Sequence, residues 1–440
     1  MSEARTHSFE THETAPKKEI LSWAMYDFAN SAYATIVATT IFNPYFVDVV
    51  AGKSSGLQEG QGTFLLTLSI AISSLAIVAT APIIGTIADA HAKKKSILAY
   101  ATSLCVTCTM LLFFVGKGAY VLGMTLLILA NFAYGTAEDL VAAFLPELAA
   151  KKDMGRISAL GWTIGYTGGL LALALCFAYI VFAKGKGMSA EQFVPVTMLL
   201  TGSIYAVGSL PMFLVVKERA RPDPEASKHN PFVVGFARLK KTLGHAMHYQ
   251  DLFRFLICLL VYTCGTTTVI SLASVYAQQE MGFTTNDCVK MIFVVNVTAA
   301  IGAFCIGFLQ DKIGSIKTLA ISLSLWIVAT GGAYFCTDRT MFWVLANLIG
   351  LAMGASGSSG RALVGLFSPP GRSGEFFGLW GLAGKLATAI GPLTYGLVAM
   401  LANHRLALLS STSFFVIGLI LVFLVNEERG KEAAHKSIED

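Results

Sequence analysis

Charged residues are scarce in this sequence. Asp, Glu, Lys and Arg make up only 13% of its 440 residues, whereas soluble globular domains carry roughly 25%. Hydrophobic residues instead account for 55%, and the mean hydropathy is +0.64. They gather in runs of about twenty residues, the length that lets a helix cross a bilayer. These properties exclude a soluble globular fold and predict an integral membrane protein.

Groups that could bind a metal or carry catalysis are also sparse. The eight cysteines lie almost entirely within apolar runs, where small buried thiols are expected, and no second pair accompanies Cys105 and Cys108. His245 and His248 have no third ligand nearby. The glycine-rich stretch 354–360 lacks the GKS or GKT ending of a phosphate loop. We therefore predict no enzyme activity, no metal and no cofactor.

Twelve apolar runs divide the chain into two halves. A polar tail (1–19) precedes six runs in a first half (20–216), and a polar linker (217–252) leads to six runs in a second half (253–426) and a second tail (427–440). Backbone groups in lipid must be hydrogen-bonded internally, so every run is predicted to be a helix. The predicted spans are 20–48, 63–88, 96–115, 120–143, 157–182, 193–216, 253–277, 288–309, 315–336, 341–363, 374–400 and 405–426.

The linker contains an amphipathic segment. Phe232, Phe236, Leu239 and Leu243 share one side of a predicted helix, and basic residues occupy another. Such a helix can lie on the inner membrane surface or pack against the inner face of the bundle. The pattern does not decide between these two positions.

Lysine and arginine orient the chain in the membrane. With a cytoplasmic N-terminus, 24 of them fall on inner segments and 7 on outer ones, and Lys385 alone lies within a span. Cytoplasmic loops carry such an excess of basic residues. We therefore predict that both termini face the cytoplasm, in a plasma (bacterial inner) membrane. The bias also accounts for the formal net charge of +5, so no nucleic-acid partner is predicted.

Two similar loops relate the halves to each other. GTIADAHAKKK begins at Gly85 and GFLQDKIGSIK begins at Gly307, at the ends of the second and eighth runs. Each loop places an aspartate four residues after the glycine, and Asp89 and Asp311 are 222 residues apart. A repeat of six spans is typical of one large class of secondary transporters, whose binding site lies between the halves.

The loops resemble the signature loop of the major facilitator superfamily, in which a glycine, three residues and an aspartate precede basic residues. The match is imperfect, because alanine replaces a basic residue at Ala90 and a glycine at Ala92, and Ser315 replaces a basic residue in the second copy. The resemblance implies an all-α polytopic protein whose twelve helices work by alternating access, with these loops latching one state. The latch residues that it implies are Gly85, Asp89, Lys93, Asp311 and Lys312.

Three further patches narrow the resemblance. They are WAMYDFANSAYA at 23–34, LGWTIGYTGGLL at 160–171 and SPPGRSGEFFGLWGLAGKLATAIGP at 368–392. Together they resemble the branch of the superfamily that is similar to the fungal vacuolar amino-acid effluxers involved in autophagy. That branch implies the export or exchange of small solutes such as amino acids. By analogy, Arg361 and Glu375 are expected to be inner-gate partners.

Polar residues in the first span are candidates for a binding site. Tyr26, Asn30 and Tyr33 fall within about 60° of one another on a helix, and Asp27 lies beside them. The residues predicted to face lipid are Met25, Phe28, Ala32 and Ile36. An aspartate at this depth needs a polar cavity or a partner. The group can therefore line a pocket, or Asp27 can fix the packing of a neighbouring helix.

Charged residues in two other spans add to this site. On the fourth span, Asn131 and Glu138 share a side and Asp139 lies beside them. The two acids can form a proton site, since burial raises a carboxyl pKa, or be solvated at the cytoplasmic mouth. Lys385, near the centre of the eleventh span, must pair or face water. Its predicted counter-charge is Asp27 or Glu138.

The eleventh and fifth spans supply the remaining features. Lys385 lies on a stripe of small residues that is predicted to permit close helix approach. Trp162 and Tyr166, four residues apart on the fifth span, are predicted either to pack or to contact a ligand. The predicted substrate site thus draws residues from the first, fourth, fifth and eleventh spans.

The sequence predicts a secondary transporter for a small polar solute, with an amino acid or a similar zwitterion favoured. No ATPase motif is present, so the driving force is predicted to be a proton gradient or solute exchange. The expected partners are the small-molecule substrate, protons and the lipid bilayer, and the chain is expected to be a monomer. Peptides, nucleosides, siderophore-like and drug-like compounds are alternative substrates. A receptor or a channel without saturable transport is the alternative from another class.

Overall fold

The structure is a computed structural model, which describes residues 14–148, 154–219, 233, 237, 240, 243–244, 247, 249–367 and 373–436. Across these ranges the chain is mainly helical and no strand occurs. Most of the predicted amphipathic linker helix falls outside them.

The first half contains six long helices. The first of them, α1 (Lys17–Thr35), continues through the π-helical turn η1 (Ile36–Thr40), the short α2 (Phe42–Tyr45) and a second π-helical turn, η2 (Phe46–Val50). The other long helices are α3 (Gln61–His91), α4 (Lys94–Leu111), α5 (Tyr120–Ala142), α7 (Met154–Gly185) and α8 (Ala190–Val215). The short elements are η3 (Lys53–Ser55), η4 (Leu112–Phe114) and α6 (Leu145–Leu148).

The second half repeats this plan with six long helices and a shorter one. They are α10 (Gln250–Met281), α11 (Thr285–Ile313), α12 (Ser315–Phe335), α13 (Arg339–Phe367), α14 (Ser373–Leu401), α15 (His404–Val422) and α16 (Glu427–Lys436). Among the described residues, 11 helices are long and apolar enough to cross a membrane. The one predicted span missing from these eleven is the eighth, 288–309, which corresponds to the 29-residue helix α11. The prediction of an all-α fold with twelve spans is confirmed.

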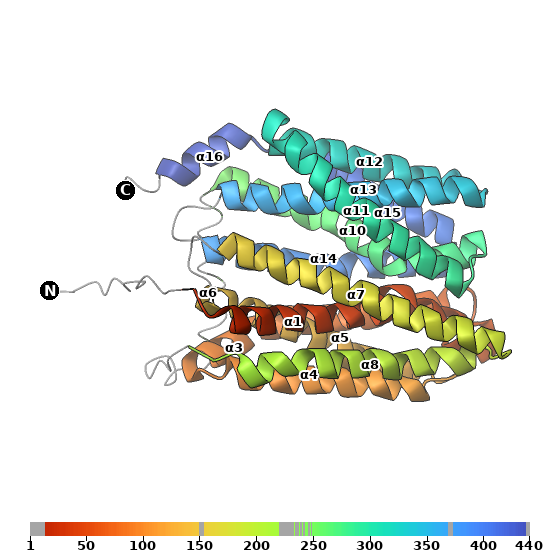
Figure 1. Cartoon of the computed structure of the whole chain (residues 1–440). Helices are drawn as coiled ribbons and strands as arrows, with labels where there is room; N and C mark the ends of the chain where they lie inside the picture. Colours follow the sequence, from red (N-terminus) through yellow and green to blue (C-terminus); the bar gives the residue numbers. More distant parts are fainter. Residues whose placement is uncertain are drawn as a thin grey trace.

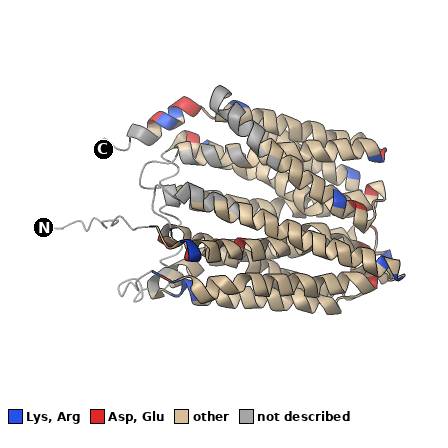
Figure 2. Cartoon of the chain, in the orientation of Figure 1, with Lys and Arg blue, Asp and Glu red and all other residues tan. Residues whose placement is uncertain are grey.

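The long helices run side by side, and the start of α1 and the helix α16 lie at the same end of the bundle (Figure 1). We call this end the terminal end and the opposite one the far end. Figure 2 shows that most of the coloured charged residues lie near these two ends, with uncharged helix between them. The hydrophobic middle of the bundle is therefore the part that lipid can surround.

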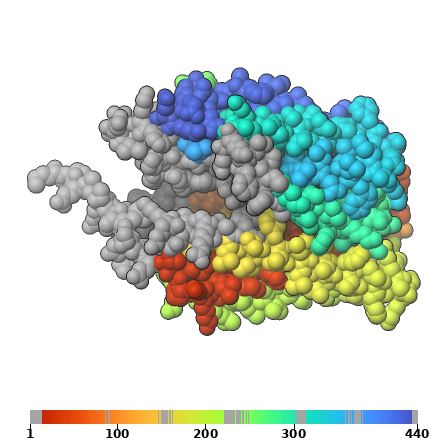
Figure 3. Space-filling view, turned by 45° about the horizontal axis from the view of Figure 1, so that its top comes forward, coloured from red at the N-terminus to blue at the C-terminus, as the bar shows by residue number. Residues whose placement is uncertain are grey.

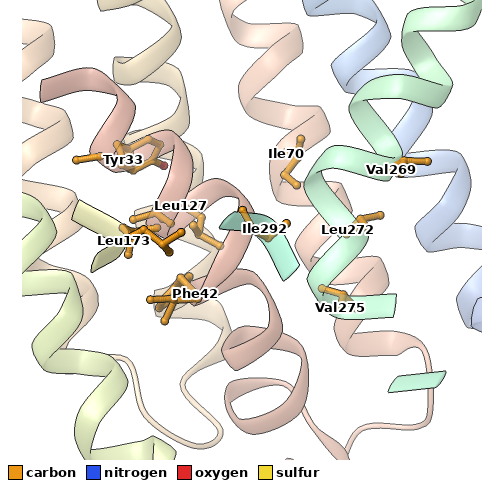
Figure 4. Close-up of a cluster of buried hydrophobic side chains, with 14 of the residues drawn as sticks. Tyr33, Phe42, Ile70, Leu127, Leu173, Val269, Leu272, Val275 and Ile292 are labelled. Carbon is orange, nitrogen blue, oxygen red and sulfur yellow. The ribbon is translucent and has the colours of Figure 1, made fainter. Parts of the chain in front are cut away.

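The two halves meet along several helices. In Figure 3 the first half, coloured red to yellow-green, lies against the second half, coloured teal to blue. α14 of the second half packs along α3 of the first, while α11 contacts α7 and α10 contacts the π-helical part of the first span. Figure 4 shows Tyr33, Phe42 and Leu127 gathered within the first half, and Val269 and Leu272 along α10.

The first span is more buried than predicted. Ala32 and Ile36, which were expected to face lipid, are fully buried. α7 and α8 both pack against α1, and α7 brings glycines to the contact. A Cβ at Gly168 would lie 2.2 Å from the carbonyl oxygen of Phe28. Small residues let the helix backbones approach this closely, so the prediction of a lipid face was wrong for Ala32 and Ile36, whereas Met25 and Phe28 are partly exposed.

The internal repeat extends to the caps at the terminal end. In the first half, Glu218 follows the sixth long helix and accepts hydrogen bonds from the N–H groups of Lys94 (2.6 Å) and Lys95 (3.3 Å) at the start of α4. In the second half, Glu427 follows the sixth long helix and accepts one from the N–H of Ile316 (3.0 Å) at the start of α12. We call these arrangements the first and second clasps. A carboxylate there satisfies unpaired N–H groups and opposes the positive end of the helix dipole.

Each clasp is accompanied by an ion pair. The guanidinium of Arg219 lies 2.9 Å from Glu19 at the start of α1. In the second half, Arg429 Nη2 donates to Asp251 Oδ1 (2.7 Å) at the start of α10. The acid at the start of the first helix of each half is thus bound by an arginine that follows its sixth helix, which ties the ends of each half together.

Candidate functional site

An ion pair joins the halves inside the bundle. Lys385 Nζ, on α14, donates a hydrogen bond to Glu138 Oε2, on α5, at 2.6 Å. It also lies 3.9 Å from Asp139 Oδ1. The side chains of Lys385, Glu138 and Asp139 are 20%, 44% and 45% exposed in the protein, so the cluster borders open space rather than a sealed core. Of the two predicted counter-charges for Lys385, the structure places Glu138 against it.

Glycines on both helices make room for this cluster. A Cβ at Gly135 would lie 3.4 Å from Lys385 Nζ, so the bare glycine leaves space for the ammonium group. On α14 itself, an added Cβ at Gly378 or Gly381 of the predicted stripe would meet no atom within 4 Å. This part of the small-residue stripe therefore borders open space, and the prediction that it allows close helix approach was wrong here. Close approach occurs instead further along α14, at Gly391.

Asp27 lies on the side of α1 that faces α7. A Cβ at Gly161 would lie 2.6 Å from Asp27 Oδ2, and one at Gly165 would lie 3.4 Å from the Cβ of Asp27. No ion pair joins Asp27 to Lys385, so that predicted pair is absent. The reason is the orientation of α1 about its own axis. Asp27 packs against the glycines of α7, whereas Glu138 and Asp139 project from α5 toward Lys385 on α14. Asp27 remains a half-buried carboxylate at a helix contact.

Tyr26 and Asn30 belong to a hydrogen-bonded network within the first half. The hydroxyl of Tyr26 lies 2.6 Å from Thr102 Oγ1 on α4 and 3.2 Å from the hydroxyl of Tyr205 on α8. Tyr205 in turn donates to Asn30 Oδ1 at 2.8 Å. Both tyrosines are fully buried. The network positions α1 against α4 and α8, and these two predicted pocket residues line neither of the two cavities between the helices described below.

Thr102 and Tyr205 were missed by the sequence analysis. The sequence marks each of them only by a hydroxyl group within a mainly apolar run, and many other threonines and serines in this chain have the same property. Most of those hydroxyls bond to a carbonyl three or four residues earlier in their own helix, as Thr109 does with Cys105. Only the packing of the helices distinguishes the hydroxyls that bond across them.

Tyr33 and Asn131, two of the predicted site residues, are in contact. The hydroxyl of Tyr33 donates to Asn131 Oδ1 at 2.8 Å. The ring of Tyr33 also stacks on that of Tyr134, with centroids 5.0 Å apart and an angle of 29° between the planes. Tyr33 is fully buried and Asn131 is partly exposed, so this pair fixes α1 to α5 next to the Glu138 helix face.

A cavity of about 170 Å³ lies between α1 and the second half. Its wall is mostly apolar, and Val269, Leu272 and Ile292 in Figure 4 are part of it. The polar residues that line it are Thr35, Thr39, Thr268, Tyr276, Asn296 and Tyr395. We call it the α1–α10 cavity. The sequence analysis did not predict it, because its apolar lining is indistinguishable in sequence from lipid-facing or core residues.

A smaller cavity of about 110 Å³ lies between α3 and α5, toward the terminal end. Asp139, Thr136, Gly85 and Lys94 line it. Asp139 therefore faces Lys385 on one side and this cavity on another. Lys94 also forms an ion pair with Glu147 at 3.0 Å. The predicted latch residue Gly85 is part of this wall, where it leaves open space beside the helix.

The remaining predicted residues are distributed as follows. Tyr166 is 57% exposed on α7. Lys93 precedes α4, beside the first clasp. The side chains of Trp162, Asp89, Asp311, Lys312, Arg361 and Glu375 lie outside the described part of the structure. The predicted latch and inner gate therefore stay predictions. Seven cysteines are free and buried in the described part, and no group of three metal-binding side chains occurs there.

Comparison with known proteins identifies the family. The profile described as "Vacuole effluxer Atg22 like" matches residues 15–435. The chain belongs to this family. It is 28% identical over 424 residues to YxiO of Bacillus subtilis, an uncharacterized transporter of the major facilitator superfamily type, and the match covers 95% of this chain and 97% of that relative.

Two further comparisons agree with this assignment. The autophagy-related protein 22 of Eremothecium gossypii is 21% identical over 494 residues, covering 98% of this chain and 95% of the relative. A variant of the nucleoside transporter NupG superposes with a TM-score of 0.70 at 13% identity, covering 92% of this chain and 99% of that structure. The latter likeness shows the fold alone. The Atg22-like chain is thus a membrane transporter of the major facilitator type and not an enzyme.

Proposed function

We propose that this Atg22-like protein is a secondary active transporter that moves a small zwitterion, such as an amino acid, by alternating access across the plasma membrane. The observation that carries the proposal is the Lys385–Glu138 ion pair, which joins the halves at 2.6 Å while both side chains stay partly exposed. A charge pair in this position can be opened by a ligand of matching charges. Intramembrane charges are costly, so they are expected where a substrate or ion path needs them.

The proposed recognition follows from the chemistry of the pair. A carboxylate of the substrate replaces Glu138 as the partner of the Lys385 ammonium. The ammonium of the substrate then binds the released Glu138 or the neighbouring Asp139, whose Oδ1 lies 3.9 Å from Lys385 Nζ. A zwitterion thereby supplies a new partner for each member of the Lys385–Glu138 pair, whereas a simple anion would leave Glu138 without one.

The driving force is proposed to be a proton gradient or exchange of one solute for another. Asp139 borders the α3–α5 cavity toward the terminal end, so a proton can reach this carboxylate without passing the Lys385–Glu138 contact. Proton binding at Asp139 would then alter the number of negative charges facing Lys385. The direction of net transport is proposed to be export, as the family description "effluxer" suggests.

Counterflow in proteoliposomes tests the proposal. Vesicles loaded with each of the twenty amino acids in turn are diluted into a trace of the same labelled compound, and its accumulation is followed. Wild-type protein should accumulate at least one amino acid, and Lys385→Met and Glu138→Gln should each reduce its initial rate by about 10²-fold or more, the loss of an interaction worth about 3 kcal/mol. Lys184→Met is the matched control, because Lys184 is an exposed lysine at the far end of α7.

A second candidate substrate class is supported by the α1–α10 cavity. Its mostly apolar wall suits an amphipathic, drug-like compound better than a bare zwitterion. Export of such a compound would depend on the lining of this cavity and little on Lys385. Counterflow of hydrophobic dyes in the same vesicles separates the two candidates, since only the zwitterion proposal requires the Lys385→Met protein to be inactive.

A further inference from the structure

The first span is irregular where it passes between the halves. η1 (Ile36–Thr40) and η2 (Phe46–Val50) are both π-helical, and the N–H of Ile41 bonds to the carbonyl of Ile36, five residues earlier, at 3.0 Å. Pro44, between the two turns, has no N–H to contribute. Single π-helical turns inside α-helices mark functional sites more often than regular turns do, because they disturb the i to i−4 ladder of hydrogen bonds.

Asn43 bridges this irregular segment to the other half. Its side chain is only 1% exposed. The amide nitrogen donates one hydrogen bond to the carbonyl of Ala38 within the first span (2.8 Å) and one to the carbonyl of Ser271 on α10 (3.1 Å). Both partners are acceptors, so the site needs an NH₂ group with two donors. Aspartate and leucine offer none there, and serine and threonine offer only one.

The bridge lies near the far end, where other contacts also join the halves. The side chain of Gln279 on α10 donates to Asp48 of the first span, but both of these residues are exposed. A Cβ at Gly60 would lie 2.4 Å from the carbonyl oxygen of Ala399, which shows how closely the loop before α3 approaches α14. Of these far-end contacts between the halves, the hydrogen bond from Asn43 to Ser271 is the buried polar one. Water therefore cannot readily replace this bond while the far end is closed.

The π-helical turn also contains an unsatisfied group. The hydroxyl of Thr40 is buried and has no hydrogen-bond partner in the described part of the structure. A threonine in a regular helix commonly bonds to the carbonyl four residues earlier, and Thr40 makes no such bond in this π-helical turn. The π-helical conformation of η1 therefore costs the free energy of an unsatisfied buried hydroxyl. The hydrogen bonds of Asn43 are among the contacts that stabilise this conformation.

We propose that Asn43 is a positioning residue for transport: its amide holds the far end closed, and release of the Ser271 carbonyl is an obligatory step when the halves rock apart there. This inference rests on the alternating access of the proposed function. The direction of the effect follows from solvation. In the closed state the two carbonyls depend on Asn43, whereas opening the far end lets water satisfy Ser271. Loss of the NH₂ group therefore destabilises the closed state more than the open one.

Spin-label distances measure this equilibrium without any substrate. Lys53→Cys in the first half and Lys290→Cys in the second place labels on exposed far-end residues, and the described native cysteines are buried. The labelled full chain is studied in lipid nanodiscs by electron–electron double resonance. Asn43→Leu and Asn43→Asp should raise the ratio of the long-distance, open population to the closed one by about three- to tenfold, the range expected for one net hydrogen bond.

Two variants make the result specific. Asn347 has a partly buried amide that bonds to the carbonyl of Trp343 within α13 and does not reach the other half. Asn347→Leu should leave the distance distribution unchanged. Asn43→Gln, which keeps both donors on a longer side chain, should return the distribution toward that of the wild type. A merely structural role would make all these variants lower the melting temperature without changing the ratio of the two populations.

The outcomes are decisive. An unchanged distance distribution in folded Asn43→Leu protein would overturn the proposal, and so would a shift of equal size in Asn347→Leu. If Asn43→Leu does not fold, Asn43→Ser decides, because it keeps one donor and should give an intermediate shift. Failure of the zwitterion proposal would look different: no amino acid would show counterflow, while the Asn43-dependent shift in distances would persist.

Discussion

Lys385 Nζ lies 2.6 Å from Glu138 Oε2, and this ion pair joins α14 of the second half to α5 of the first inside the bundle. The pair is neither sealed in the core nor free at the surface, since its side chains are 20% and 44% exposed. The two charges therefore interact more strongly than they would in bulk water, and a ligand can still reach them.

The two charges should prove to be coupled in stability. Lys385→Met or Glu138→Gln alone leaves one charge without its partner, and we expect each to lower the free energy of unfolding by about 1–3 kcal/mol, less than for a fully buried pair because both groups are partly exposed. The double variant should lose less than the sum of the two. Unfolding in detergent, analysed as a double-mutant cycle, measures the coupling. Strictly additive losses would show that the charges do not interact.

Gly161 should tolerate no side chain. An alanine Cβ there would lie 2.6 Å from Asp27 Oδ2 and 2.9 Å from the ring of Trp23, so Gly161→Ala is expected to destabilise the protein by about 1–3 kcal/mol through overpacking. Gly185→Ala is the matched control on the same helix, because a Cβ there would meet no atom within 4 Å. Thermal unfolding of the two variants makes the comparison. Equal melting temperatures would mean that α7 does not hold Asp27 as described.

The hydroxyl of Tyr205 should contribute measurably to the packing of α1. Tyr205→Phe removes the donor to Asn30 Oδ1 and leaves that buried oxygen unsatisfied, which is expected to cost about 1–3 kcal/mol. Tyr100→Phe is the control, since Tyr100 is 78% exposed. The melting temperature of Tyr205→Phe should fall and that of Tyr100→Phe should stay the same. A similar change in both would assign the effect to hydroxyls in general rather than to the network.

The second clasp should make stability depend on pH. Burial raises the pKa of Glu427, but hydrogen bonds from Lys431 and from the N–H of Ile316 outweigh it and hold this pKa below the ordinary value of 4.5. A lowered pKa means that the stabilisation is fully present above pH 4.5 and is lost as the pH falls through the folded-state pKa. The stability difference between the wild type and Glu427→Gln should therefore shrink on acidification below that value.

A neighbouring acid supplies the control for this clasp. Glu428 is 81% exposed and pairs only with Lys431 at 3.3 Å among the described residues. Glu428→Gln should leave both the melting temperature and its pH dependence close to those of the wild type. A stability difference for Glu427→Gln that stays constant from neutral to acid pH would show that Glu427 is not ionised in the clasp.

The orientation in the membrane is open to a direct test. The excess of basic residues at the terminal end predicts that this end is cytoplasmic. Lys18→Cys, exposed at the start of α1, should react with an impermeant maleimide only from the cytoplasmic side, and Lys186→Cys, exposed at the far end, only from outside. Labelling of Lys186→Cys in inside-out vesicles and not in intact cells would reverse the proposed orientation.

Much of the fold could be predicted because it depends on local properties of the sequence. A run of about twenty apolar residues becomes a helix in lipid whatever its neighbours are, so the twelve spans are confirmed within a few residues except where the helices extend beyond the apolar core, as α10 does to Met281. The need of Lys385 for a partner was also visible, since an ammonium so far from both ends of its span cannot reach water along its own helix.

The tertiary structure decided which groups meet. Asp27 and Glu138 are equally plausible partners for Lys385 in sequence, and only the rotation of α1, fixed by glycines of α7 and by the Tyr26–Tyr205 network, turns Asp27 away from α14. The bridge from Asn43 to Ser271 joins residues 228 positions apart, between two backbone carbonyls that no side-chain pattern reveals. The hydrophobicity of a run determines whether that run forms a membrane-spanning helix. A hydrogen bond between two helices instead needs two atoms within about 3 Å of each other, and only the packing of the helices determines which atoms come that close.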